Sequence, residues 1–223
     1  MRSHPKSPLE FPILIKDYFR VELKGVFLSS QKLFTMKKVG VIGSGSMGIG
    51  IAQVAATAGH EVVLFDTNQG ALKKAMGKLQ KILARLVEKG KIDESTSTDV
   101  FGRITPASNL NQMQGCGIVI EAIVEDLEIK KSVFSKLEEI CGEDCVLATN
   151  TSSLSVAAIA AACKNPNRVI GVHFFNPAPL MPLVEIIPAI QTAEAITSAT
   201  RELVDSWKKV TVFFWVRGEK KTI

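Results

Sequence analysis

The sequence predicts an α/β fold that is doubly wound, with a mainly parallel sheet and helices on both faces. Three observations support this class. Short apolar segments alternate along the chain with segments in which apolar residues recur at helical spacing. Most of the apolar segments contain few polar residues, which is typical of parallel strands buried on both faces. A glycine-rich turn follows the first apolar segment and leads directly into a helix-like pattern, as in a β-α-β unit.

The strands are expected where apolar residues run almost without interruption. In chain order these segments are residues 37–42, 61–66, 117–122, 145–150, 168–175 and 183–187. A weaker segment lies near Ile104. Because helical segments separate most of the strands, we expect most of them to run parallel.

The helices are expected where apolar residues recur every three or four positions. In chain order they cover residues 46–58, 68–88, 128–140, 156–162 and 193–207. Gly59 ends the first helix, whose small residues suit close packing on the sheet. Asn68 can cap the second helix, and Gly90 follows its last turn.

Composition narrows the class of protein. The chain has 223 residues, of which 46% are apolar, so it can bury a sizeable core in one large domain or one domain with appendages. No apolar run is long enough for a membrane span, and no secretory signal is recognisable, so we expect a cytoplasmic protein without a membrane partner. Four cysteines lie in or beside apolar segments, as buried thiols do, and they lack the spacing of a metal site. They are Cys116, Cys141, Cys145 and Cys163.

The net charge of +5 is unevenly distributed. Residues 1–35 and 208–223 carry an excess of Lys and Arg, whereas residues 36–207 carry a slight excess of Asp and Glu. A surface that binds nucleic acid usually has a basic stripe along structured elements, and we recognise none in the sequence. We therefore expect no nucleic-acid partner.

The glycine-rich turn has the spacing of a dinucleotide-binding loop. Gly43, Gly45 and Gly48 follow the first strand and open the first helix, in the pattern GxGxxG. The first glycine permits the tight turn, the second lets the backbone approach a pyrophosphate, and the third lets helix and strand pack closely. Ser46 and Met47 begin the helix, where unpaired N–H groups favour phosphate. The loop therefore predicts a Rossmann-like domain.

An acidic residue at the end of the second strand indicates which cofactor this loop binds. Asp66 lies twenty-one residues after Gly45. A carboxylate at this place accepts hydrogen bonds from the adenosine ribose and repels a 2′-phosphate, so NAD is favoured over NADP. The alternative is an ordinary turn followed by an ordinary strand-end Asp. The order of strand, loop, helix, strand and acid favours the cofactor site.

Two polar segments lie at the carboxyl ends of later strands, the edge where ligands bind in open α/β sheets. They are NTSS, residues 150–153, and HFFNPAP, residues 173–179. Glu185 lies in the next strand, so adjacent strands could bring its carboxylate to the His173 imidazole. Such a partner orients the ring and stabilises its protonated form. Spacing alone leaves open whether His173 is an acid–base catalyst or a hydrogen-bonded core histidine.

Four segments together resemble the 3-hydroxyacyl-CoA dehydrogenases, and within them the bacterial 3-hydroxybutyryl-CoA type. The segments are GVIGSGSMGIGIAQVAATAGHEVVLFD, IVIEAIVEDLEIKKSVF, ATNTSSLS and GVHFFNPAPLMPLVEII, in the family's order and spacing. The resemblance runs from about Met36 to Val212. It implies NAD-dependent oxidation of a 3-hydroxyacyl-CoA to the 3-oxoacyl-CoA, or the reverse reduction, in fatty acid and butanoate metabolism.

The resemblance also implies roles for single residues. His173 matches the family's acid–base residue, Glu185 matches its carboxylate partner, and Ser152 matches a serine that touches both substrate and nicotinamide. Four further residues match positions that contact cofactor or substrate. Asn176 matches a cofactor contact, Glu125 and Lys130 match residues near the nicotinamide ribose, and Lys89 matches a lysine that meets the CoA moiety. For Lys89 the alternative is an ordinary solvated lysine on a helix.

The sequence departs from the family at both ends. The resemblance implies an all-helical domain after residue 212, which closes the substrate cleft and forms the family's homodimer, so the oligomeric state of this chain is doubtful. We expect residues 1–35 to be an upstream extension and residues 213–223 to be an aberrant tail after a frame change. Two alternatives to an active dehydrogenase stay open. One is a catalytically impaired NAD-binding fragment, and the other is a relative that acts on another hydroxy substrate or serves as a structural protein.

Overall fold

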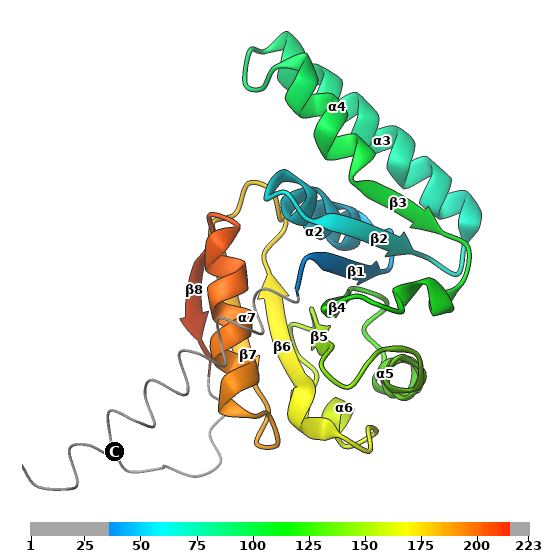
Figure 1. The fold of residues 1–223 in the computed structure, drawn as a ribbon, viewed down its shortest axis with the longest axis vertical. Coiled ribbons are helices and arrows are strands. Elements are labelled where there is room, and N and C mark those ends of the chain that lie inside the picture. Colours follow the sequence, from blue (N-terminus) through cyan, green and yellow to red (C-terminus); the bar gives the residue numbers. More distant parts are fainter. Residues whose placement is uncertain (1–35, 215–223) are drawn as a thin grey trace, which may run out of the picture.

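A computed structural model describes residues 36–214, which form one eight-stranded sheet with helices on both faces (Figure 1). The strand order is β3-β2-β1-β4-β5-β6-β7-β8. The strands are β1 Lys38–Ile42, β2 Glu61–Phe65, β3 Ile104–Ala107, β4 Ile118–Glu121, β5 Val146–Thr149, β6 Val169–Phe174, β7 Leu183–Pro188 and β8 Val210–Phe213. All neighbours pair in parallel except β6 and β7, which are antiparallel. The predicted doubly wound, mainly parallel α/β class is confirmed.

The helices connect these strands across both faces of the sheet. They are α2 Ser46–Thr57, α3 Gln69–Glu88, α4 Glu94–Gly102, α5 Leu127–Ile140, α6 Val156–Ala160 and α7 Glu194–Ser206, with short 3-10 helices η1 Leu110–Met113 and η2 Pro166–Arg168. Side chains alternate between two buried apolar clusters: Val62 and Leu64 of β2 lie in one, and Val63 lies in the other. The first cluster includes residues of α2, α3 and α7, and the second includes residues of α5 and α6. Strands β1, β2, β4, β5 and β6 are therefore covered on both sides, as their uniform apolar composition predicts, whereas the edge strand β8 is mostly exposed.

Helices α3 and α4 form a hairpin that projects beyond the β3 edge of the sheet (Figure 1). Asn68 caps α3, its side chain accepting a hydrogen bond from Ala71 N–H at 2.9 Å. Asp93 caps α4 in the same way, accepting from Thr96 N–H at 2.6 Å. We call this hairpin, residues 69–102, the arm.

The structure adds elements that the sequence did not predict. These are α4, β8 and the two 3-10 helices, whereas the weak segment near Ile104 is indeed a strand, β3. The other predicted strands and helices occur within a few residues of their expected bounds. The expected extension, residues 1–35, and the end of the expected tail, residues 215–223, lie outside the described residues.

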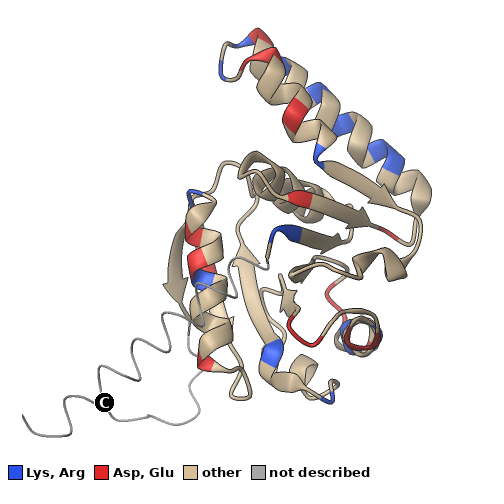
Figure 2. Ribbon diagram, viewed as in Figure 1, with Lys and Arg blue, Asp and Glu red and all other residues tan. Residues whose placement is uncertain are grey.

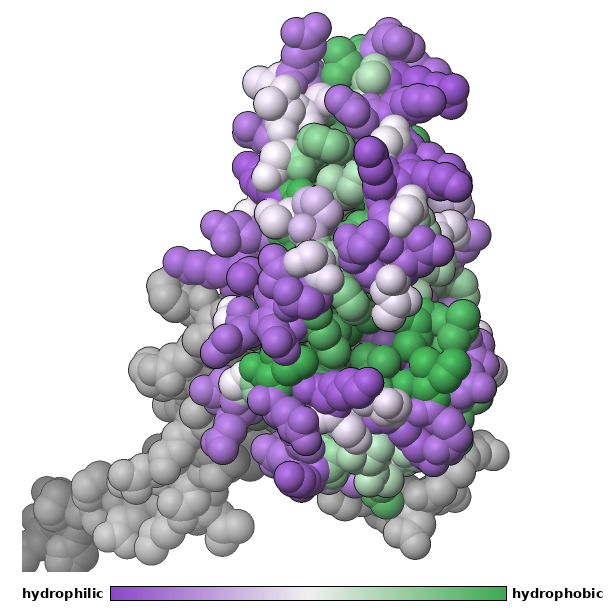
Figure 3. Space-filling view, turned by 90° about the vertical axis from the view of Figure 1, so that its right-hand side faces the viewer, coloured by the Kyte–Doolittle hydropathy of each residue, from purple (hydrophilic) through white to green (hydrophobic). Residues whose placement is uncertain are grey.

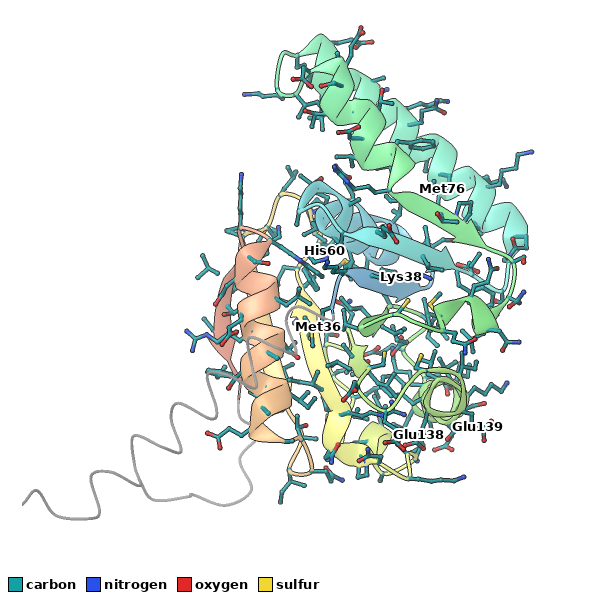
Figure 4. The ribbon with its side chains drawn as sticks, viewed as in Figure 1. Met36, Lys38, His60, Met76, Glu138 and Glu139 are labelled. Carbon is teal, nitrogen blue, oxygen red and sulfur yellow. The ribbon has the colours of Figure 1, made fainter. Side chains whose placement is uncertain are left out.

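The four cysteines are free and buried, as their apolar surroundings predict. Burial raises the pKa of the Cys116 thiol to about 12 and that of Cys163 to about 11. Met36, at the start of the described chain, is also fully buried (Figure 4). Within residues 36–214 no helix has the length and apolar character needed to cross a membrane.

The contact between α2 and β1 depends on the absence of a side chain at Gly48. A Cβ at this position would lie 1.8 Å from the carbonyl oxygen of Gly43. The helix can therefore approach the turn after β1 only because residue 48 is glycine.

We expect Gly48→Ala to lower the free energy of unfolding by about 2 kcal/mol, because the added methyl group overlaps backbone atoms that cannot move easily. Urea unfolding followed by circular dichroism measures this loss. Gly77→Ala is the matched control, since nothing lies within 4 Å of a Cβ there in the exposed part of α3. It should raise stability by about 0.5–1 kcal/mol, as Gly-to-Ala changes in helices do. Equal effects of the two substitutions would contradict this account of the packing.

Candidate active site

The candidate site lies at the carboxyl edge of the parallel strands. Strand β1 stands between β2 and β4. The chain continues from β1 to β2 and β3 on one side, and later returns to β4 on the other side. The strand order therefore reverses at β1, and open α/β sheets bind ligands at such a reversal. The loops that follow β1, β4, β5 and β6 all reach this edge. Figure 3 shows the side of the molecule toward which β1 and β2 point, with apolar surface exposed below the arm.

The glycine loop has the geometry that a dinucleotide requires. Gly43 has a φ of 97°, a left-handed conformation that favours glycine, and its N–H donates to Phe65 O at 2.8 Å. Gly45 is the N-cap of α2, has no side-chain cap, and faces open space where its Cβ would be. The N–H groups of Ser46 and Met47 in the first turn of α2 are therefore available to an anion. These residues fit the pyrophosphate of a dinucleotide.

Asp66 is held firmly at the end of β2 by residues of the loop. Its Oδ2 accepts hydrogen bonds from the N–H and the hydroxyl of Ser44, both at 2.7 Å, and its Oδ1 accepts from Asn68 N–H at 2.8 Å. Burial alone would raise the pKa of Asp66, but the hydrogen bonds from Ser44 and Asn68 outweigh it and hold the pKa below the ordinary value. The carboxylate is thus charged and fixed at the end of β2, beside the glycine loop. The sequence did not reveal the part played by Ser44, because x in GxGxxG carries no expectation.

His173 and Glu185 face each other across the antiparallel pair β6–β7. They are direct partners in the strand register, and His173 Nδ1 lies 2.8 Å from Glu185 Oε2. Both side chains are partly buried, with exposed fractions of 17% and 24%. The adjacency predicted from the strands is therefore present. Since a carboxylate can only accept, Nδ1 must donate, and in a neutral ring Nε2 is then the proton acceptor.

Glu125 organises the loop that carries Ser152. Its Oε1 accepts hydrogen bonds from Ser152 N–H at 3.2 Å, from Ser153 N–H at 3.3 Å and from the Thr151 hydroxyl. The resemblance places Lys130 near the nicotinamide ribose. Its side chain is only 1% exposed, and its Nζ forms an ion pair with Glu125 Oε2 at 3.3 Å. Glu125 and Ser152 are thus at the surface of the site, and Lys130 is beneath it.

Asn150 joins the β5 loop to the strand that carries His173. Its Oδ1 accepts a hydrogen bond from Phe174 N–H at 2.9 Å, and its own N–H donates to Glu121 O at 2.8 Å. This contact ties the Ser152 loop to the end of β6. Asn176, two residues farther, is exposed in the β6–β7 loop and lines the groove that begins at the glycine loop.

A groove of about 950 Å³ runs from the glycine loop along α2, between the arm and the β6–β7 loop. Its walls are mainly apolar. Four lysines also line it: Lys74, Lys78, Lys208 and Lys209. Lys89, which the resemblance assigns to CoA, is the exposed C-cap of α3 and is not among the lining residues. Lys74 and Lys78 therefore line the groove, and Lys89 does not.

The distribution of charge differs from the expectation in one respect. Figure 2 shows basic residues, in blue, along the ribbon of α3, which carries Lys73, Lys74, Lys78, Lys81 and Arg85. The expectation that no structured element bears a basic stripe was therefore wrong. The summed charge of residues 36–207 conceals the local excess on α3, because acidic residues on the other elements offset it. Among the described residues, no three His, Cys, Asp or Glu side chains form a group that could hold a metal ion.

Comparison with known proteins finds a matching family model and several relatives. The family model for the NAD-binding domain of 3-hydroxyacyl-CoA dehydrogenases matches residues 38–216. A 3-hydroxybutyryl-CoA dehydrogenase of Clostridioides difficile is 46% identical over 78% of this chain and 62% of its own length. A 3-hydroxyadipyl-CoA dehydrogenase of Escherichia coli is 44% identical over 79% of this chain and 37% of its own length.

A solved structure gives the same result in three dimensions. The crystal structure of a 3-hydroxybutyryl-CoA dehydrogenase from Escherichia coli superposes with a TM-score of 0.80 and 43% identity, over 81% of this chain and 38% of that chain. The chain thus spans less than two thirds of these relatives. Because the family model matches residues 38–216, well over half of the chain, and these relatives are 43–46% identical to it, the chain belongs to the 3-hydroxyacyl-CoA dehydrogenase family, whose NAD-binding domain it carries.

Proposed function

We propose that the chain takes part in the NAD-dependent oxidation of a 3-hydroxyacyl-CoA to the 3-oxoacyl-CoA, and in the reverse reduction. The observation that carries this proposal is the His173–Glu185 pair, 2.8 Å apart at the same sheet edge as the glycine loop. A bound NAD would supply the hydride acceptor for the oxidation. Gly45, Ser46 and Met47 would hold its pyrophosphate, and Asp66 would hold the adenosine ribose.

The proton is the part of the chemistry that the chain's own residues handle. In the oxidation His173 Nε2 takes the proton of the 3-hydroxyl group while C3 loses a hydride, so that the alcohol becomes a ketone. Glu185 stabilises the imidazolium that forms, because its carboxylate already accepts from Nδ1. In the reduction the imidazolium returns the proton to the 3-oxo oxygen. Ser152, on the loop held by Glu125, orients the reacting groups.

The groove suits the extended pantetheine part of an acyl-CoA. Its apolar walls along α2 and α3 can pack against the pantetheine chain, and Lys74 and Lys78 can meet phosphate groups as positive charges. A second candidate is an NAD-binding fragment with impaired turnover. It is favoured by the wide exposure of apolar side chains near the groove, such as Leu180 at 77% and Ile82 at 45%.

His173→Asn tests the acid–base role. With acetoacetyl-CoA and NADH, the rate of NADH oxidation should fall about 100-fold or more, since proton transfer by a positioned side chain contributes about that much. The dissociation constant for NADH should change little. An unchanged rate would contradict the role of His173, and a wild-type chain that binds NADH without turnover would support the second candidate.

Asp66→Ala should weaken NADH binding about tenfold, because a hydrogen bond to a charged group is lost. Binding of NADPH should change less, so that the preference for NADH shrinks. Since the pKa of Asp66 lies below the ordinary value, the wild-type advantage should be complete at neutral pH and disappear only as the pH falls through that lowered pKa. Fluorescence titration measures both affinities. Asp99→Asn, at an exposed position of α4, is the control and should leave both affinities unchanged.

Lys74→Ala/Lys78→Ala tests the groove. The KM for acetoacetyl-CoA should rise about fivefold to thirtyfold with kcat nearly unchanged, because exposed charge contacts contribute about 0.5–1 kcal/mol each and act on binding. The rise should shrink at high salt. Lys73→Ala/Lys81→Ala is the matched control on the same helix, since neither lysine lines the groove. Equal effects of the two pairs would mean that α3 attracts CoA only through its total charge.

A further inference from the structure

A buried ion-pair network lies beneath the loop that carries Ser152. Glu121, the last residue of β4, has no exposed surface. Its Oε1 accepts hydrogen bonds from Lys130 Nζ at 2.6 Å and from Ile123 N–H at 2.7 Å, and its Oε2 accepts one from the Thr149 hydroxyl at 2.8 Å. The Glu121 carboxylate thus links the end of β4 to Thr149 of β5 and to Lys130 of α5.

Lys130 links this carboxylate to a second one. Its Nζ also lies 3.3 Å from Glu125 Oε2, and only 1% of the lysine side chain is exposed. An ammonium group this deeply buried is tolerated only when nearby charges compensate it. Of its two carboxylate partners, Glu121 is fully buried and Glu125 is exposed, so Glu125 is the partner through which Lys130 contacts the loop.

Glu125 carries the network to the loop. The Oε1 that accepts from the N–H groups of Ser152 and Ser153 belongs to the same carboxylate whose Oε2 faces Lys130. The Thr151 hydroxyl donates to Oε1 as well and accepts from Leu154 N–H at 3.0 Å, which closes the turn. The conformation of residues 151–154 therefore depends on a charged and fixed Glu125.

We propose that Glu121 and Lys130 are positioning residues that fix Glu125 and, through it, the loop that presents Ser152 to the nicotinamide end of the cofactor. This inference rests on the proposed function, because it assigns the purpose of the loop. It is a role besides the one that the resemblance gives to Lys130, which is a place near the nicotinamide ribose. In the structure Lys130 is buried and its partner Glu125 is exposed.

The network also keeps Glu125 ionised. Burial alone would raise the pKa of Glu125, but the hydrogen bond from Thr151 and the positive charge of Lys130 outweigh burial and hold the pKa below the ordinary value. Lys130 of α5 faces Glu125 directly, and Glu121 of β4 lies behind Lys130. The neighbouring Asp126 is engaged as the N-cap of α5. A protonated Glu125 would keep less acceptor capacity and would lose its negative charge, so its hydrogen bonds from the N–H groups of the loop would weaken.

The test is the pH dependence of NADH binding to the Lys130→Met chain, measured by fluorescence titration from neutral into acidic solution. Without the lysine, the acid limb of the binding curve should move up by about one pH unit, the smaller end of the effect that a nearby opposite charge has on a carboxyl pKa. The matched control is Lys131→Met, which removes the next lysine of α5 and its exposed pair with Glu128. The control should leave the acid limb where it is in the wild-type chain.

A double variant separates positioning from simple stabilisation. Glu121→Gln/Lys130→Met removes both buried charges, so it should unfold at a higher temperature than Lys130→Met, yet its acid limb should stay shifted because Glu125 still lacks its cation. It also serves if the single variant does not fold. If wild type binds NADH and the acid limb is at its wild-type position in either variant, the positioning role is wrong. If the wild-type chain itself binds no NADH, the proposed function is wrong, and this inference, which rests on it, is wrong as well.

Discussion

The antiparallel pairing of β6 with β7 is the constraint on which the proposed chemistry depends. In a parallel sheet each strand points its carboxyl end to the same edge, and a side chain from the next strand usually arrives only after a long connection. Here β7 follows β6 after the loop of residues 175–182 and runs antiparallel to it, so His173 and Glu185 become cross-strand partners. A slip of one residue would send one of them to the opposite face of the sheet. The hydrogen bond between them is therefore a consequence of strand register.

The rest of the site is arranged around the same edge by hydrogen bonds between loops. Ser44 holds Asp66 after β2, Glu125 holds the loop after β5, and Asn150 ties that loop to β6. Each contact joins segments that are distant in sequence and neighbours in the sheet. In the proposed function, these contacts between loops would hold a cofactor and the His173 imidazole in fixed positions relative to each other, which is what orientation in catalysis requires.

The sequence was sufficient for features that depend on local patterns. Apolar runs located most of the strands, and glycine spacing located the turn after β1. The sequence was insufficient for features whose position or burial is decided by tertiary packing. Helix α4 has only Val100 buried and gains its place by packing on α3, so its own periodicity is too weak to predict it. Lys130 looks like a surface residue in an amphipathic helix, and its burial follows from Glu121 on another element. Lys74 and Lys78 become groove residues only because the arm folds over α2.

The proposed chemistry depends most on Glu185 fixing the tautomer of the neutral His173 ring. Nitrogen-15 NMR of the chain labelled at histidine tests this most directly, with the His173 signals assigned by their loss in His173→Asn. The neutral ring should carry its proton on Nδ1 and leave Nε2 unprotonated, and Glu185→Ala should abolish this preference. A neutral ring that carries its proton mainly on Nε2, or a tautomer that does not respond to Glu185→Ala, would contradict the account.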